Sequence, residues 1–129
     1  MERPRDRLGR PLSAGADQSE AFPSIPPRDT VSSEVAWAEA QEYVSLGLPF
    51  HAHEVFEQRW RSCPPEERDL WRALAQWGAA LTHQARGNAK GAVQVADRAM
   101  KLLEGCVIRA PIDKDGVMAS LKGIGDQLT

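Results

Sequence analysis

The chain has 129 residues, room for one domain, and its 16 Lys and Arg against 18 Asp and Glu give a formal net charge of −2. This balance excludes the positive field of a dedicated nucleic-acid binder, so nucleic-acid binding would need a local basic patch. Charges and prolines stand where a signal peptide has its apolar run, and no later stretch is long enough to span a bilayer. We therefore expect a cytoplasmic protein without a membrane segment.

Residues 1–29 are predicted to form a flexible head. They hold five of the nine prolines and almost no periodic apolar residues, so they cannot bury enough surface to order themselves. The arginines at positions 3, 5, 7 and 10 are expected mainly to keep this head soluble, although an acidic partner or a phosphate group would also suit them. The rest of the chain, 30–129, is predicted to be the folded domain.

Five helices are expected in that domain, packed as one compact all-α bundle. Apolar residues recur at helical spacing, and no stretch shows the two-residue alternation of a strand. Gly47 with Pro49 should end the first helix, and Gly87-Asn88 should stop one helix and cap the next, which predicts an antiparallel hairpin. The predicted ranges are 32–46, 50–61, a long helix opened by Pro64-Pro65 and reaching Arg86, 89–104, and 114–128.

Helix 50–61 places a small cluster of polar groups among aromatic residues. At about 100° per residue, one arc of this helix holds Phe50, His53, Phe56, Glu57 and Trp60. The two ionisable groups in this arc are expected to be shielded from water, so they must pair with each other or bind something.

The long helix before Arg86 is expected to have two buried sides. One side carries large apolar residues, namely Leu70, Trp71, Leu74, Trp77 and Leu81. The other side carries Gln76, Ala79, Ala80 and His83, where the alanines allow another helix to come close. If helix 50–61 packs there, His53, Glu57, Gln76 and His83 converge.

Three interpretations of this cluster remain open. In the first, a divalent metal such as zinc is bound by His53, Glu57 and His83, with a coordination position left for water. The segment from His53 to Glu57 also resembles a metalloprotease HExxH helix whose last His is replaced, which would make Glu54 the general base. In the second, the cluster is a structural hydrogen-bond network, and in the third it is an ordinary exposed pair.

The residues His53, Glu57 and Trp60 spell H-x-x-x-E-x-x-W, the hallmark of the bacterial and archaeal family called domain of unknown function 309, and the chain resembles that family over about residues 34–104. The stretch Arg3 to Leu12 is also similar to the N-terminal extension of actinobacterial members. The resemblance implies a compact helical bundle and a signature proposed to bind metal, and it implies no established activity.

Three functional hypotheses follow. The first is a metal-binding protein, with metal-dependent hydrolysis as the candidate reaction, in which Glu54 or Gln76 orients water. The alternative is a non-enzymatic helical adaptor for a protein partner, with the cluster as a structural network. Nucleophilic catalysis by Cys63 or Cys106 is poorly supported, because neither cysteine has a histidine nearby in the sequence, and both are expected to be reduced thiols rather than a disulfide.

Overall fold

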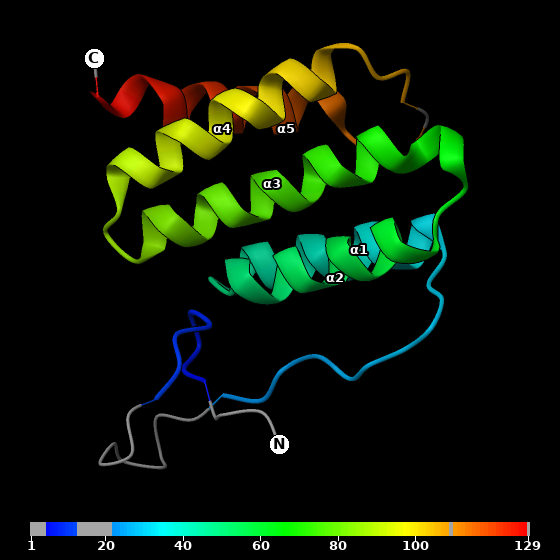
Figure 1. Cartoon of the computed structure of the whole chain (residues 1–129), viewed down its shortest axis with the longest axis horizontal. Helices are drawn as coiled ribbons and strands as arrows, with labels where there is room; N and C mark the ends of the chain where they lie inside the picture. Colours follow the sequence, from blue (N-terminus) through cyan, green and yellow to red (C-terminus); the bar gives the residue numbers. More distant parts are fainter. Residues whose placement is uncertain (1–4, 13–21, 109, 129) are drawn as a thin grey trace.

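Five α-helices make up most of the described chain, residues 5–12, 22–108 and 110–128, in the computed structural model (Figure 1). No strand forms within these ranges, so the predicted all-α class is confirmed. Two 3-10 turns, η2 before α3 and η3 after α5, complete the element order. The bounds are α1 Ser33–Ser45, α2 Pro49–Ser62, η2 Pro65–Glu67, α3 Arg68–Ala85, α4 Ala89–Glu104, α5 Lys114–Gly125 and η3 Asp126–Leu128.

Side-chain caps explain where three of the helices begin. The side chains of Ser32, Asn88 and Asp113 accept hydrogen bonds from backbone N–H groups in the first turns of α1, α4 and α5. Gly47 and Gly87, which follow α1 and α3, have positive φ angles of 74° and 80°, the conformation that suits glycine after a helix end. The predicted punctuation of the chain is thus confirmed.

The start of α3 and the end of α5 differ from the prediction. Pro64-Pro65 does not open the long helix, because residues 65–67 form the tighter turn η2 and α3 begins only at Arg68. The last helix ends at Gly125, and its final turn is the 3-10 turn η3. Both differences are a tightening of a terminal turn, which is common at helix ends.

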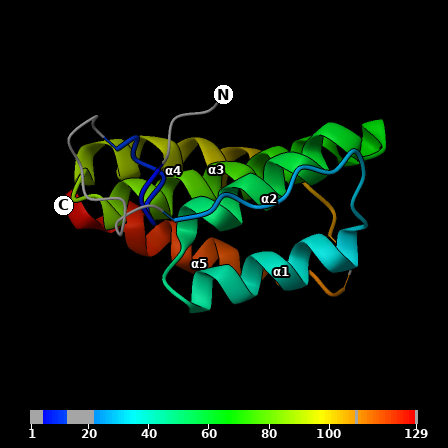
Figure 2. The same ribbon diagram turned by 90° about the horizontal axis from the view of Figure 1, so that it is seen from below.

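Helix α3 lies at the centre of the bundle. It packs between α2 and α4, while α1 packs on α2 and α5 packs on α4 and α3 (Figures 1 and 2). The predicted hairpin of α3 and α4 is confirmed, and the alanines at 92, 96 and 99 on α4 are fully buried, which lets these two helices approach closely. Helix α3 thus has a neighbour on each side, but of the residues predicted for its second buried side only Ala80 is buried, while Gln76, Ala79 and His83 are half-buried.

Large aromatic side chains fill the core. Trp71 and Phe56 are fully buried, and Trp77 is 5% exposed, with its indole N–H donating to the hydroxyl of Ser120 at 2.9 Å. Buried tryptophans of this kind supply apolar area and need a partner for their N–H group. Trp71 and Trp77 are thus core residues, and neither lines a groove for a partner helix.

Part of the predicted head is described. In residues 5–12 the backbone of Gly9 packs on the ring of Phe50, and Arg5 and Arg86 place their guanidinium groups 5.8 and 6.0 Å from the centre of that ring. Residues 1–4 and 13–21, Arg3 among them, lie outside the described residues, as does the side chain of Leu128. The flexibility of the head and the domain boundary at Thr30 stay predictions.

In the described part of the chain, no helix is both long and apolar enough to cross a bilayer.

Candidate functional site: a histidine and glutamate pair between α2 and α3

His53 and Glu57 form the predicted pair one turn apart on α2. The Nε2 atom of His53 lies 2.6 Å from Oε1 of Glu57, and the two side chains are 23% and 39% exposed. The pair is thus partly shielded from water at the edge of the bundle, with His53 more buried than Glu57.

His53 also contacts the backbone of α3. Its Nδ1 atom donates to the carbonyl oxygen of Ala75 at 2.7 Å, and Gly78, one turn further along α3, faces the Cα atom of His53. A carbonyl accepts only, and Glu57 accepts on the other ring nitrogen. When the ring carries two protons, Nδ1 donates to Ala75 on α3 and Nε2 donates to Glu57 on α2. His53 thereby links α2 to α3.

The surroundings of His53 favour this charged form. Burial by itself lowers the pKa of His53, but the hydrogen bonds to Glu57 and Ala75 and the nearby charges of Glu57 and Glu54 raise it more. The pKa of His53 is thus raised above its ordinary value of 6.5. A doubly protonated ring has no lone pair with which to bind a metal or accept a proton.

Glu57 is stabilised as a carboxylate by the same contact. Its hydrogen bond to His53 lowers its pKa below the ordinary 4.5, burial opposes the shift, and the charges of His53 and Arg61 add to the lowering. The guanidinium of Arg61 is 3.9 Å from Glu57. Glu54 lies beside Glu57 along a groove of about 620 Å³ between α2 and residues 24–27.

The structure joins only two of the residues predicted to converge. His83 lies in the last turn of α3, where its Nδ1 atom is 3.1 Å from the side-chain nitrogen of Asn88. The Oε1 atom of Gln76 is buried without a hydrogen-bond partner in the described residues, and no hydrogen bond found there links Gln76 or His83 to His53. Nor do three His, Cys, Asp or Glu side chains of the described chain come close enough together to hold one metal ion.

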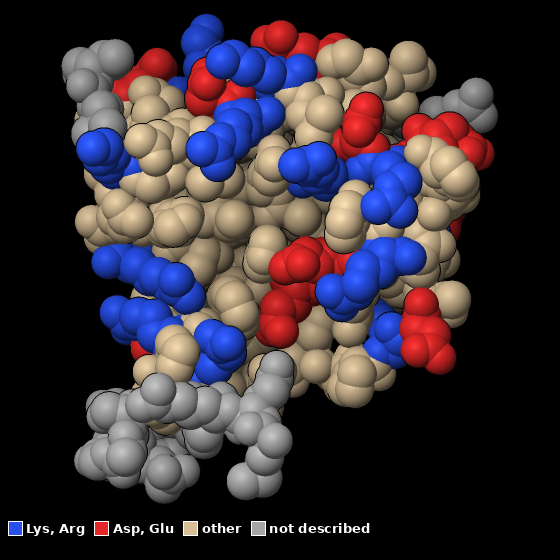
Figure 3. All heavy atoms as spheres, in the orientation of Figure 1, with Lys and Arg blue, Asp and Glu red and all other residues tan. Residues whose placement is uncertain are grey.

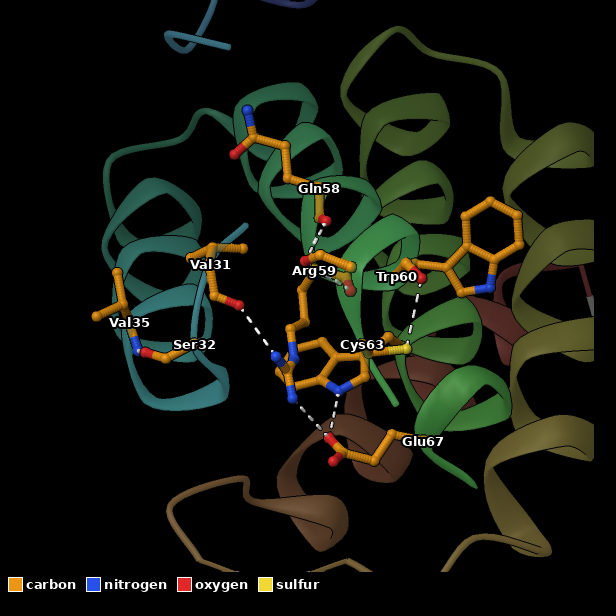
Figure 4. A network of polar contacts seen from close by, with 10 residues as sticks. Val31, Ser32, Val35, Gln58, Arg59, Trp60, Cys63 and Glu67 are labelled. Atoms are coloured by element: carbon orange, nitrogen blue, oxygen red, sulfur yellow. Dashed lines mark hydrogen bonds and ion pairs between the residues drawn. The ribbon is translucent and has the colours of Figure 1, made fainter. Parts of the chain in front are cut away.

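Trp60, the last residue of the signature, packs against the hydrophobic core from the end of α2. Its ring is half-buried and stacks against the guanidinium of Arg68, 4.6 Å from the ring centre. Figure 4 shows the ring pointing away from the polar network at the end of α2. Trp60 therefore covers the junction of α2 and α3. Among the described residues, no hydrogen bond joins it to His53 or Glu57.

That polar network is centred on Arg59, which sequence reasoning missed. The guanidinium of Arg59 donates to the carbonyl of Val31 at 3.0 Å and to Glu67 at 3.1 Å (Figure 4). The same oxygen of Glu67 accepts from the indole N–H of Trp71 at 2.9 Å, and Arg59 lies over the ring of Trp71. The network ties α2, η2, α3 and the lead into α1 together.

Sequence reasoning also missed two buried polar residues of α2, His51 and Gln58. His51 is 3% exposed and Gln58 is 5% exposed, and both donate to backbone carbonyls of the extended segment before α1, at Pro23 (2.7 Å) and Pro26 (2.9 Å). No signal in the sequence identifies them, because a carbonyl acceptor far along the chain has no side-chain signature.

The two cysteines lack the surroundings of catalytic thiols. Both are free and half-buried, and burial raises the pKa of each. Each thiol donates weakly to a backbone carbonyl of the preceding turn, that of Trp60 for Cys63 and that of Leu102 for Cys106. A raised pKa reduces the thiolate fraction, so neither side chain is an activated nucleophile.

Charges of both signs are mixed on the face shown in Figure 3. Basic side chains gather at the end where residues 5–12 pack, and acidic groups lie among basic ones over the remainder of this face. No continuous positive surface covers it, which agrees with the net charge of −2.

Residues 37–95 match the family described as domain of unknown function (DUF309). A relative, the uncharacterised protein YpuF of Bacillus subtilis (strain 168), is 32% identical over 70 residues, which cover 48% of this chain and 40% of that protein. The chain therefore matches less than half of the length of this relative. No solved structure matches. The resemblance inferred from His53, Glu57 and Trp60 is confirmed, over a range somewhat shorter than the expected 34–104.

Proposed function

From the match of residues 37–95 to DUF309 and from the position of His53 inside the bundle, we propose that the chain is a non-enzymatic helical binding module. In this function the signature pair of His53 and Glu57 is a structural link between α2 and α3. A protein partner then binds to a surface of the bundle, and the signature pair stabilises the packing of α2 and α3 that forms this surface.

The observation that carries the proposal is the occupation of both ring nitrogens of His53 by groups of the bundle itself, the carbonyl of Ala75 and the carboxylate of Glu57. A catalytic base or a metal ligand needs a ring nitrogen that is open to substrate or metal. The surface of the helical layer supports the binding role, because α1 and α2 already hold an extended segment of chain against their outer side.

A second candidate function, metal-dependent hydrolysis at the same cluster, is favoured by one contact. The Nδ1 atom of His53 faces a carbonyl, and metal-binding histidines commonly have this contact while they present Nε2 to the ion. His53 and Glu57 would then be two ligands of a divalent ion such as zinc, with Glu54 as the base. The pair supplies only two ligands from one helix, so a firmly held ion would need further ligands from elsewhere.

Elemental analysis of the full chain, purified without chelators, separates the two functions. The wild type, His53→Ala and Glu57→Gln are compared, with Lys101→Ala on the exposed face of α4 as a matched control for loss of a charged residue. The binding module predicts far less than one metal ion per chain in all four proteins and lower thermal stability in the first two variants. Near-stoichiometric zinc in the wild type that is lost in both cluster variants would contradict the proposal and establish the metal site.

We place this module in a reducing compartment such as the cytoplasm. The support is the pair of free, half-buried cysteines, Cys63 and Cys106, since disulfides are rare where thiols are kept reduced.

A further inference from the structure

The segment before α1 is held on the bundle in the manner of a bound peptide. Residues 22–28 have no regular secondary structure and run alongside α2 in both views (Figures 1 and 2). The side chains that hold them come from the helices: His51 donates to the carbonyl of Pro23, and Gln58 donates to the carbonyl of Pro26. Both donors are buried, so their hydrogen bonds are shielded from water and costly to leave unmade.

The spacing of these two contacts suits a proline-rich ligand. Three residues of an extended polyproline backbone rise about 9 Å, and seven residues of an α-helix rise about 10 Å, so donors at 51 and 58 meet carbonyls at 23 and 26. Prolines offer carbonyl acceptors without N–H groups, and they lose little conformational entropy on binding. The helix therefore recognises a backbone pattern rather than a particular apolar side chain.

A charged contact follows the two carbonyl contacts. The guanidinium of Arg28 makes a two-atom contact with the carboxylate of Glu39 on α1, and its Nε atom donates to the side-chain oxygen of Gln58 at 2.8 Å. Gln58 thus makes hydrogen bonds to both the carbonyl of Pro26 and the side chain of Arg28, two positions later. Arginine suits this position because its planar fork can contact a carboxylate with two atoms at once.

The segment does not fill the surface on which it lies. The segment forms one wall of a hollow on each side. On the α1 side, residues 25–28 and the facing side chains of Glu39, Glu42, Tyr43 and Leu46 line about 400 Å³. On the α2 side, residues 24–27 and the facing side chains of Glu54, Glu57, Gln58 and Arg61 line about 620 Å³. Phe22, which packs edge-on against the ring of His51 at 5.0 Å, remains 39% exposed. The surface therefore has room for a ligand larger than the chain's own segment, and the helical walls of the two hollows carry four glutamates and one arginine, Arg61.

We infer that the α1 and α2 face is a receptor for an extended, proline-rich segment of a protein partner, with prolyl carbonyls three residues apart and an arginine two residues after the second. Residues 22–28 are the occupant supplied by the chain itself, and they close the receptor until a stronger segment displaces them. This inference rests on the proposed function of a binding module and names the class of partner that the module takes.

The test uses the full chain and a labelled synthetic peptide with the sequence of residues 22–29, measured by fluorescence anisotropy. In the Arg28→Ala chain the resident segment loses its contact with Glu39, while the added peptide keeps its own arginine. Because the resident segment competes at an effective concentration on the order of millimolar, we expect the variant to bind the peptide about fivefold more tightly than the wild type. Arg28→Lys, which keeps the charge and loses the fork, should give an intermediate affinity.

Matched controls test the recognition itself. A peptide with Arg28→Ala should bind the Arg28→Ala chain about fivefold more weakly than the natural peptide, and this preference should largely disappear in an Arg28→Ala/Glu39→Gln chain. The inference would be overturned if both peptides bound the Arg28→Ala chain with equal affinity. It would also be overturned if the natural peptide bound a chain of native helicity no more tightly than a scrambled peptide does. Metal bound at His53 would instead contradict the proposed function and leave the peptide affinities unchanged, so the two failures are distinguishable.

Discussion

The backbone of Gly78 on α3 lies directly against His53 on α2: a Cβ atom at position 78 would stand 2.8 Å from the Cα atom of His53. We expect Gly78→Ala to push the two helices apart and to weaken the hydrogen bond from His53 to Ala75. Although alanine favours a helix over glycine by about 1 kcal/mol, the steric conflict with backbone atoms should make the variant less stable by more than that. Urea denaturation measures the change.

Gly123→Ala is the control for this prediction. Gly123 is exposed on α5, and a Cβ atom there has no neighbour within 4 Å. The substitution should therefore stabilise the protein by up to about 1 kcal/mol. A Gly78→Ala protein that is as stable as Gly123→Ala would show that α2 and α3 are not in close contact at His53.

The pair of His53 and Glu57 predicts a pH dependence of stability. The raised pKa of His53 adds stability that is full below its unfolded value of 6.5 and is lost as the pH rises through the folded value. The lowered pKa of Glu57 adds stability that is full above its unfolded value of 4.5 and is lost as the pH falls through the folded value. Both contributions are present together between about pH 4.5 and 6.5.

The measurement is the Tm of the wild type and of Glu57→Gln at pH 5.5, 7 and 9. Because Glu57 is partly exposed, water screens the pair, and we expect a difference of only about 1 kcal/mol, or about 4 °C, at pH 5.5. The difference should narrow by pH 9. A difference that stays constant or widens with pH would mean that His53 is not charged in the folded protein.

Removal of Arg59 should be costly. In Arg59→Ala the carbonyl of Val31 loses its side-chain donor and Glu67 keeps only the indole N–H of Trp71, and the side chain of Arg59 is only 13% exposed. We expect a loss of about 2 kcal/mol in the free energy of unfolding. In contrast, Lys101→Ala breaks an exposed pair with Asp97 and should change stability by no more than about 0.5 kcal/mol. Equal effects of the two substitutions in urea denaturation would refute the structural role of Arg59.

The thiols of Cys63 and Cys106 should react slowly. Burial raises the pKa of both, so alkylation by iodoacetamide at pH 7, followed by mass spectrometry, should be at least about tenfold slower than for free cysteine. Denaturation in urea should remove the difference. A thiol in the folded chain that reacts as fast as free cysteine would revive the hypothesis of a nucleophile.

Local signals in the sequence predict most of the fold. The bounds of α4 are as predicted, because Asn88 caps its start and Gly105 follows its end. The pairing of His53 with Glu57 is also predictable, since residues four apart share one face of a helix. The start of α3 was not predicted, because Glu67 in the turn at 65–67 accepts hydrogen bonds from Arg59 and Trp71, and no capping pattern in the sequence indicates these contacts.

The site is less predictable than the fold. His53 finds its partner on α3 in the carbonyl of Ala75, and His51 finds one in the carbonyl of Pro23, 28 residues away. Backbone acceptors have no residue type by which a sequence pattern could reveal them. The expected convergence of Gln76 and His83 assumed a packing of α2 on α3 that periodicity alone does not determine.

The most direct measurement of the central claim is the nitrogen NMR spectrum of the His53 ring in the full chain, recorded against pH and again after addition of zinc. We expect protons on both Nδ1 and Nε2 at pH 5.5, a titration midpoint above 6.5, and signals that do not shift with stoichiometric zinc. A midpoint below 6.5 together with zinc-dependent shifts of Nε2 would contradict it and make His53 a metal ligand.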